Sequence, residues 1–222
     1  MYFSRISLQD DAQRTLDFWR VFQNPYILHQ SIWKLFGDHA DRKRDFLYRL
    51  EQNKSRPMIY AVSAREPSGT RDLWRVETKG YEPKINPGAR LAFMLRANPI
   101  RAKRDEENKQ HRHDVVMEAK TRQKEQGEKK LIPQIIQEEG LNWLSSRAEK
   151  CGFIVKPEDV RADGYQQHRF VKGKGGKQVS LSTLEFNGAL TVADPKLFLE
   201  TLYEGIGPAK GFGCGLMLVR RI

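Results

Sequence analysis

The stretch NPYILHQSIWKLF, residues 24–36, decides how the first part of the chain folds. Asn24 and Pro25 predict a helix start, because an asparagine side chain caps free backbone N–H groups and a proline at the first helical position needs no hydrogen bond. The apolar residues that follow recur at helical spacing: Ile27, Leu28, Ile32, Leu35 and Phe36. We therefore predict a helix that begins beside Tyr26 and turns its apolar side toward a core.

Strand and helix patterns flank this helix on both sides. Residues 2–8 alternate apolar and polar side chains, which predicts a half-buried strand, and residues 10–23 carry apolar residues at helical spacing. Downstream, the patterns predict one helix over 42–51 and three strands over 58–64, 73–76 and 89–100. The pair Asn98-Pro99 should end the last of these strands. This order is compatible with a ferredoxin-like arrangement of helices on a mixed or antiparallel sheet.

The second half of the chain repeats the same theme. The patterns predict a helix over 134–150, a strand with two turns over 165–192, a helix capped by Asp194-Pro195 and a closing strand over 215–221. The first of those turns is glycine-rich and the second is expected at Asn187-Gly188. The predicted fold class is α+β, with mostly antiparallel sheets. We expect three parts: an N-terminal unit over 1–100, a charged connector over 101–130 and a C-terminal unit over 131–222.

The charge balance points to a polyanionic partner. The 222 residues include 39 Lys+Arg and 28 Asp+Glu, for a formal net charge of +11, and 39% of them are hydrophobic. This is the composition of a folded basic protein, and nucleic acid is the commonest partner of such proteins. No run of about 18 apolar residues and no signal-peptide pattern occurs, so the expected location is cytoplasmic, with no membrane partner.

The sequence gives little sign of a metal site or a disulfide framework. Its two cysteines, Cys151 and Cys214, are far apart and form no CxxC pattern. His111 and His113 have the form of a metal pair, but no third ligand has the spacing to complete a site. They fall in the connector, which holds 10 Lys+Arg and 7 Asp+Glu and has little apolar periodicity. We expect a solvated connector and no metal or other cofactor.

Two stretches could bind a nucleic acid. Residues 165–177 contain four basic residues, one histidine and no carboxylate, and their glycine-rich turn would let lysines follow phosphates. The stretch GIGPAKGFGCGLM, residues 205–217, matches neither the Walker A pattern nor GxGxxG. Its glycines still allow backbone amides to approach a phosphate, with Lys210 adding charge. A solubilising hairpin and a tight crossover between helix and strand are the alternatives for these stretches.

Tyr26 and His29 form the candidate catalytic pair. Residues three apart lie on one face of a helix, so both rings can reach the same bound group. A histidine with an unperturbed pKa of about 6.5 can act as acid or base near neutrality. Because RNA carries its own nucleophile in the 2′-OH, such a site needs only proton transfer, orientation and charge stabilisation. The alternative is that His29 is a packed structural residue.

Several of these motifs, in this order and at these separations, resemble one family. The stretches NPYILHQSIWKLF, LAFMLRANPI and GIGPAKGFGCGL resemble the CRISPR repeat-processing endoribonucleases of the type I-E Cascade system, the CasE family. MYFSRISL and LEFNGALTV are also similar to that family, so the resemblance extends from the first residue to the C-terminus.

The resemblance implies two tandem ferredoxin-like, RRM-related domains and a function. Such enzymes bind the stem-loop of a CRISPR repeat transcript, cut at its 3′ base without metal, and stay on the guide RNA with other Cascade subunits. Their products are a 5′-hydroxyl and a 2′,3′-cyclic or 3′ phosphate. The family's catalytic histidine falls on His29 and its tyrosine partner on Tyr26.

The same resemblance supplies the RNA-binding candidates. The basic hairpin that enters the RNA groove corresponds to four residues: Arg169, Lys172, Lys174 and Lys177. The RANP strand contributes Arg96. The glycine-rich loop corresponds to Gly205, Gly207, Lys210, Gly211, Gly213 and Gly215.

Two rival functions follow from the same residues. One is an RNA-binding assembly subunit of a ribonucleoprotein without catalysis, in which His29 packs and the basic surfaces only hold a guide RNA. The other is a metal-dependent nuclease, which needs clustered carboxylates; the acidic run over 105–107 lies in the charged connector, where a solvated surface is the expected role.

Overall fold

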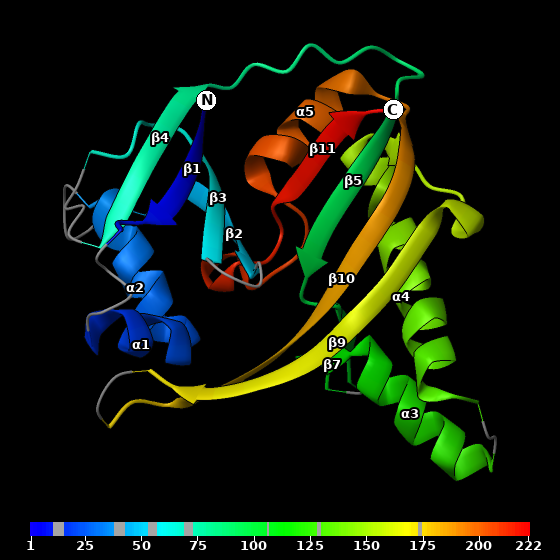
Figure 1. Ribbon diagram of the computed structural model, residues 1–222. Helices are drawn as coiled ribbons and strands as arrows, with labels where there is room; N and C mark the ends of the chain where they lie inside the picture. The colour runs from blue at the N-terminus through cyan, green and yellow to red at the C-terminus, as the bar shows by residue number, and fades with distance from the viewer. Residues whose placement is uncertain are drawn as a thin grey trace.

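The chain folds into two antiparallel sheets that lie side by side, with helices packed on each (Figure 1). The structure is a computed structural model that describes residues 1–10, 16–37, 43–52, 57–68, 73–105, 107–127, 130–172 and 175–222. The two chain termini lie at the same end of the molecule. The α+β class with antiparallel sheets, expected from the sequence, is confirmed.

The first sheet has four strands in the order β2-β3-β1-β4. Its strands are β1 (Tyr2–Leu8), β2 (Phe46–Gln52), β3 (Pro57–Ser63) and β4 (Trp74–Gly80), and each neighbouring pair is antiparallel. Two helices, α1 (Leu16–Gln23) and α2 (Pro25–Leu35), pack on it. The alternation in β1 places Ile6 and Leu8 in the same core as Ile32 and Leu35 of α2, all at most 4% exposed. Burying such side chains contributes about 1.5–3 kcal/mol each.

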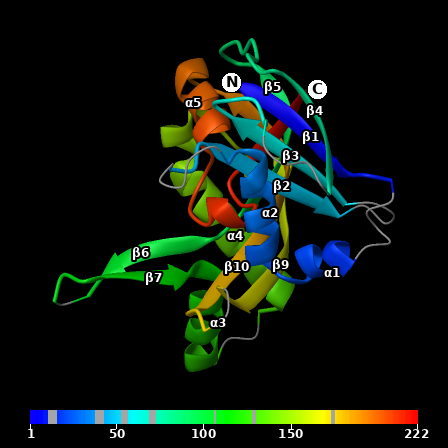
Figure 2. The same cartoon turned by 90° about the vertical axis from the view of Figure 1, so that its left-hand side faces the viewer.

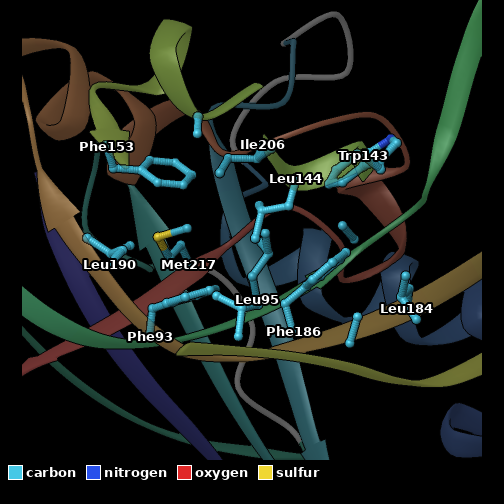
Figure 3. Packing of buried hydrophobic residues seen from close by; sticks show 14 of the residues in the cluster. Phe93, Leu95, Trp143, Leu144, Phe153, Leu184, Phe186, Leu190, Ile206 and Met217 are labelled. Atoms are coloured by element: carbon cyan, nitrogen blue, oxygen red, sulfur yellow. The ribbon is translucent and has the colours of Figure 1, made fainter. Parts of the chain in front are cut away.

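The second sheet has the order β11-β5-β10-β8, and β9 also pairs with β10. Its strands are β5 (Arg90–Ala97), β8 (Phe153–Ile154), β9 (Val160–Val171), β10 (Gln178–Val192) and β11 (Met217–Arg221). The helices α4 (Ile132–Ala148) and α5 (Pro195–Glu204) supply Leu144 and Phe198 to its core, where Phe93, Leu95 and Phe186 also lie (Figure 3). Three short 3-10 helices complete this part: η2 (Glu149–Cys151), η3 (Pro157–Asp159) and η4 (Lys210–Phe212).

A two-stranded hairpin projects from the second sheet (Figure 2). It consists of β6 (Ile100–Arg104) and β7 (Gln110–Asp114) and continues into α3 (Val115–Gln126). Asp114 caps that helix, because its side chain accepts hydrogen bonds from the backbone N–H groups of Val116 and Met117. The prediction of a connector over 101–130 is therefore wrong for most of this range, because β6, β7 and α3 occupy most of it. The expectation that it is solvated does hold for the hairpin, whose described residues are mostly exposed.

Two of the predicted elements are wrong. The helix predicted over 42–51 is wrong for its described residues, because the run from Phe46 joins the first sheet as β2. Such a short apolar run fits both the helical and the strand periodicity, and its pairing with β3 makes it a strand. The second turn at Asn187-Gly188 is also absent, since β10 continues through both residues. Gly188 instead allows a close approach: a Cβ there would lie 2.1 Å from the backbone oxygen of Asp159.

The predicted strand over 89–100 forms, but its assignment to the N-terminal unit is wrong. β5 pairs with β10 and β11, both in the second sheet. The chain therefore passes from the first sheet to the second between Gly80 and Arg90, earlier than the boundary expected at residue 100. The predicted strand over 2–8, the helix start at Asn24-Pro25 and the helices over 134–150 and 195–204 are confirmed within a few residues.

A small apolar cluster joins the two sheets. Leu47 and Val62 of the first sheet pack with Leu216, which precedes β11, and each is at most 3% exposed. This contact holds the glycine-rich loop, residues 205–216, against the first sheet. None of the helices described is long and apolar enough to span a membrane.

Candidate active site

His29 lies in the middle of α2, beside the buried face of the helix and next to the glycine-rich loop. The apolar side of α2 buries Leu28 and Ile32 in the first core, and His29 follows beside it, half-buried. Its ring packs against Trp33 on the same helix, with centroids 5.6 Å apart, and against Phe212 of the loop at 5.9 Å. The helix and the loop, nearly two hundred residues apart in the chain, thus meet at this imidazole.

Tyr48 of β2 fixes the loop beside the histidine. Its hydroxyl donates a hydrogen bond to the Gly211 carbonyl at 3.0 Å, and burial raises its pKa, so it remains a neutral donor. A Cβ on Gly211 would lie 3.5 Å from Cε1 and 3.6 Å from Nδ1 of His29, which shows how near the loop backbone runs. Gly213 has φ +78°, a left-handed conformation that favours glycine, and it packs on the Tyr48 ring.

Two cations, Arg44 and Lys172, act on this imidazole, and a third, Lys210, lies near Arg44. Burial lowers the pKa of His29, and the positive charges of Arg44 and Lys172 lower it further, whereas the Gly211 backbone raises it. Burial, followed by the charge of Arg44, also lowers the pKa of Lys210. We call this group the histidine pocket: His29, Arg44, Lys210, Gly211 and Phe212. Its surroundings favour a neutral imidazole at neutral pH.

Two polar atoms in the pocket are buried without a hydrogen bond. Among the described residues, neither Nδ1 of His29 nor Nη1 of Arg44 has a hydrogen-bond partner. Burial lowers the pKa of Arg44, but a guanidinium stays charged at neutral pH. Buried polar groups in native proteins are nearly always paired, so unpaired ones point to a missing partner such as a ligand. A phosphate would satisfy the guanidinium.

Tyr26 lies one turn before His29 on α2 and is half-buried. Its backbone N–H takes part in the helix cap, since it donates to the Asn24 side chain at 2.8 Å. In the part of the chain that the structure describes, the Tyr26 and His29 side chains form no hydrogen bond or ring contact with each other. Their shared helical face is the only geometric link between them, so the role of Tyr26 stays a prediction.

The basic hairpin forms as the ribbon of β9 and β10, and only part of it reaches the pocket. Phe170 packs against Phe212 with centroids 5.0 Å apart, and Lys172 Nζ lies 6.0 Å from the Phe212 centroid. Arg169 points to the opposite face from Phe170, because successive strand residues alternate, and both Arg169 and Lys177 are exposed. Lys174 lies outside the described residues.

Arg96 is not in the histidine pocket. It belongs to β5 and lines a cavity of about 550 Å³ between the sheets, which Gly213 and Phe212 also border. There its Nε lies 3.5 Å from Glu185 Oε1, while Arg49 donates to the other carboxylate oxygen at 2.8 Å. Glu185 thus neutralises much of the charge that Arg96 would offer to RNA.

The remaining glycines of the loop mainly shape it. Gly207 has φ +76° and packs against the Trp143 ring, since a Cβ there would lie 3.1 Å from the indole, so it supports the loop from the second sheet. The two cysteines are free thiols: Cys214 is buried and Cys151 is only partly buried. Burial raises the pKa of Cys214 to about 12, which makes it a poor nucleophile.

Sequence reasoning missed three residues of the site. Arg44 and Tyr48 fell in a segment predicted to be a helix, and Phe212 was overlooked among glycines. The signal for Tyr48 was present, since Phe46, Tyr48 and Leu50 recur at every second position, as on one face of a strand. Arg44 has no comparable signal, because its place depends on how β2 meets α2.

The residues described contain no group of three His, Cys, Asp or Glu side chains that could hold a metal ion. His111 and His113 lie on the exposed hairpin with ring centroids 6.5 Å apart. His111 Nε2 is 2.6 Å from Asp105 Oδ2, so a nearby carboxylate already pairs with this ring.

The fold and this site define a class of protein: two tandem ferredoxin-like units of α+β structure, joined where a histidine meets a glycine-rich loop. Residues 1–221 match the model of a family described as CRISPR associated protein. The chain belongs to this family.

Curated relatives are similar along nearly the whole chain. The Cascade subunit CasE of Escherichia coli strain K12 is 31% identical over 220 residues, which cover 98% of each chain. The CRISPR-associated endoribonuclease Cse3 of Thermus thermophilus is 29% identical and covers 90% of this chain and 92% of its own length. The family resemblance drawn from the motifs is therefore confirmed.

Solved structures agree with this placement. A CRISPR endoribonuclease Cse3 bound to a 19-nucleotide RNA has a TM-score of 0.74 at 27% identity, covering 99% of this chain and 100% of that chain. Thermus thermophilus Cse3 bound to an RNA that represents a pre-cleavage complex has a TM-score of 0.72 at 26% identity, covering 99% of this chain and 98% of that one.

Proposed function

We propose that this chain is an endoribonuclease that binds the stem-loop of CRISPR repeat transcripts, cuts at its 3′ base and stays on the guide RNA with other Cascade subunits in the cytoplasm. The observation that carries the proposal is the histidine pocket, where the His29 ring packs against Phe212 of the loop and the charges of Arg44 and Lys172 favour its neutral form. The relatives support the substrate: one is an endoribonuclease, another is a Cascade subunit, and a solved relative holds RNA.

The reaction needs no metal in this proposal, because RNA supplies the nucleophile. The 2′-oxygen forms a bond to the adjacent phosphorus while the bond from phosphorus to the 5′-oxygen breaks. His29 removes the proton of the 2′-OH, a role for which the neutral imidazole is required. The leaving 5′-oxygen takes a proton from water, and the protonated His29 then returns its own proton to the solvent. The products are a 2′,3′-cyclic phosphate, which water can open to a 3′ phosphate, and a 5′-hydroxyl.

Charge builds on the phosphate oxygens during this attack, and the pocket cations offset it. Arg44 has a buried Nη1 atom with no partner among the described residues, so this atom can donate to a phosphate oxygen. Lys210 and Lys172 add charge from the loop and the ribbon. Preorganised donors of this kind are among the largest contributors to catalysis. Tyr26 orients the sugar or the phosphate from the preceding turn of α2.

A cleavage assay with a chemically altered substrate tests the proposal. Purified protein is incubated in EDTA with a repeat RNA, and with the same RNA carrying a 2′-deoxy sugar at the cut position. We expect specific cleavage of the first and none of the second, although both bind equally well. Loss of cleavage in EDTA would point to a metal-dependent nuclease. A stable uncut complex with the normal RNA would point to a non-catalytic assembly subunit.

A further inference from the structure

A second cavity of about 430 Å³ is bordered by Phe212, and the candidate catalytic histidine is not part of its lining. It is bounded by the base of the β6–β7 hairpin, by β9 and β10, and by the glycine-rich loop. Its lining includes Arg112, Gln167, Ser180, Ala209 and Phe212. We call this cavity the hairpin cleft. It shares Phe212 with the histidine pocket, whose imidazole packs against the same ring at 5.9 Å.

Arg112 is the one arginine or lysine in the lining of the hairpin cleft, and it has no ion-pair partner among the described residues. It is exposed and pairs across the hairpin with Ala102. The neighbouring pair, Arg101 and His113, points to the opposite face, because successive strand residues alternate. The charges of Arg101 and His113 both act on Glu118 of α3. The hairpin therefore has a face toward α3 and a face toward the cleft.

Asp114, the acidic residue in the lining of the cleft, already forms hydrogen bonds through both carboxylate oxygens. Asp114 Oδ1 caps α3, and its Oδ2 accepts a hydrogen bond from Tyr165 at 2.8 Å. The N-terminus of α3 carries a partial positive charge that stabilises this carboxylate further. Asp114 thus has a structural role at the floor of the cleft. Arg112 remains available to an anion at its mouth.

The lining has the chemistry of a nucleotide site. Cavities of about 300–1,000 Å³ are the usual size of small-ligand sites. An aromatic ring, a guanidinium and short polar groups are what proteins use to hold an unpaired nucleotide, because the base stacks and the phosphate pairs with the cation. A base-paired stem is too wide for such a cleft, whereas one unpaired nucleotide fits.

We propose that the hairpin cleft binds one unpaired nucleotide of the RNA beside the cut, with its phosphate on Arg112 and its base or sugar against Phe212. This inference rests on the proposed function, since it takes the scissile phosphate to lie in the histidine pocket. The strand then passes over Phe212 from one site to the other. The β6–β7 hairpin acts as a second wall that holds the strand extended for in-line attack.

A matched pair of variants tests this subsite. Arg112→Ala removes the cation that faces the cleft, and Arg101→Ala removes one cation from the other face of the same hairpin. Binding is measured with a 2′-deoxy repeat RNA, which cannot be cut, over a series of salt concentrations. We expect Arg112→Ala to weaken binding roughly fivefold to tenfold and to lower the salt slope by about one. Arg101→Ala should change binding less than twofold.

Shortened RNAs identify the nucleotide. The same variants are measured with RNA lacking the single strand 5′ of the stem, lacking the strand 3′ of it, or lacking both. We expect the Arg112 effect to persist with one flank and to vanish on the stem-loop alone. Equal effects of the two variants, or an undiminished Arg112 effect on the stem-loop alone, would overturn the subsite. Wild-type cleavage of the same RNA in EDTA separates this outcome from a failure of the proposed function.

Discussion

The histidine pocket and the β9–β10 ribbon both carry basic side chains, but in opposite surroundings. Burial lowers the pKa of His29, Arg44 and Lys210 in the pocket, whereas Arg169 and Lys177 on the ribbon are exposed to water. A group that moves a proton must have its pKa set by its surroundings, which requires partial burial. A group that only attracts a polyanion works from the surface. The contrast predicts that substitutions in the histidine pocket lower cleavage without lowering RNA binding, and that substitutions on the ribbon lower RNA binding without lowering cleavage.

The largest expected effect comes from His29→Ala. Loss of the proton-transfer group should lower single-turnover cleavage by about 10² to 10⁴-fold. Binding of the 2′-deoxy repeat RNA should stay within about twofold of wild type, because the ribbon and the hairpin are intact. His113→Ala, which removes an exposed histidine from β7, is the matched control. A parallel loss of binding and cleavage would make His29 a structural residue.

Arg44→Gln should have the next largest effect, and it has a distinctive pH signature. Removing a donor to the phosphate should lower cleavage about 10²- to 10³-fold at saturating RNA. The Arg44 charge lowers the pKa of His29, so its loss must raise that pKa. The rise of cleavage rate with pH, which follows deprotonation of His29, should then shift to higher pH.

A rate–pH profile of the Arg44 variant therefore separates a direct role from a structural one. Arg5→Gln is a suitable control, because Arg5 lies on β1 and pairs with Glu77 at the surface. An Arg44→Gln enzyme that is slower but keeps the wild-type profile would contradict the electrostatic effect of Arg44 on His29.

The sequence predicted the parts of the fold that local patterns control. Asn24-Pro25 and Asp194-Pro195 carry their own capping chemistry, and the structure has a helix at each. The family resemblance named His29 and the glycine-rich loop as separate functional parts, and their contact appears only in the structure. No local pattern links residue 29 to residue 211, because their contact depends on how the two sheets pack.

The errors have the same physical origin. The pattern predicts a helix over the run from Phe46, but the run forms a strand because β3 pairs with it and both of its faces are covered. The pattern predicts a turn at Gly188, but the missing side chain instead allows β10 to pass close to the backbone at Asp159. In each case a long-range contact chose between local options that the sequence left nearly equal.

Two glycines of the loop should respond differently to alanine, which tests how the pocket is held. Gly213→Ala places a Cβ at φ +78° and 3.3 Å from the Tyr48 ring, so it should destabilise the protein by about 1–2 kcal/mol. Gly211→Ala meets only ordinary contacts with His29, at 3.5 and 3.6 Å, and should cost less. Urea unfolding measures both. Equal destabilisation by the two variants would show that the loop backbone relaxes freely.

The smallest effect is expected from the ribbon. Arg169→Ala combined with Lys177→Ala should weaken RNA binding by roughly fivefold at moderate salt and lower the salt slope by up to about two. Cleavage at saturating protein should stay near the wild-type rate, since neither residue belongs to the histidine pocket. The measurement is a binding titration at several salt concentrations, beside a single-turnover assay.

A control with the same change in charge makes this last test specific. Lys150→Ala combined with Lys196→Ala removes two exposed lysines, one in η2 and one on α5, in the helical layer of the second sheet. If net charge alone governed binding, this pair would weaken it as much as the ribbon pair does, and the salt slopes would fall together. If the ribbon contacts phosphates directly, only its own pair lowers the slope, because counterions are released only where the RNA lies.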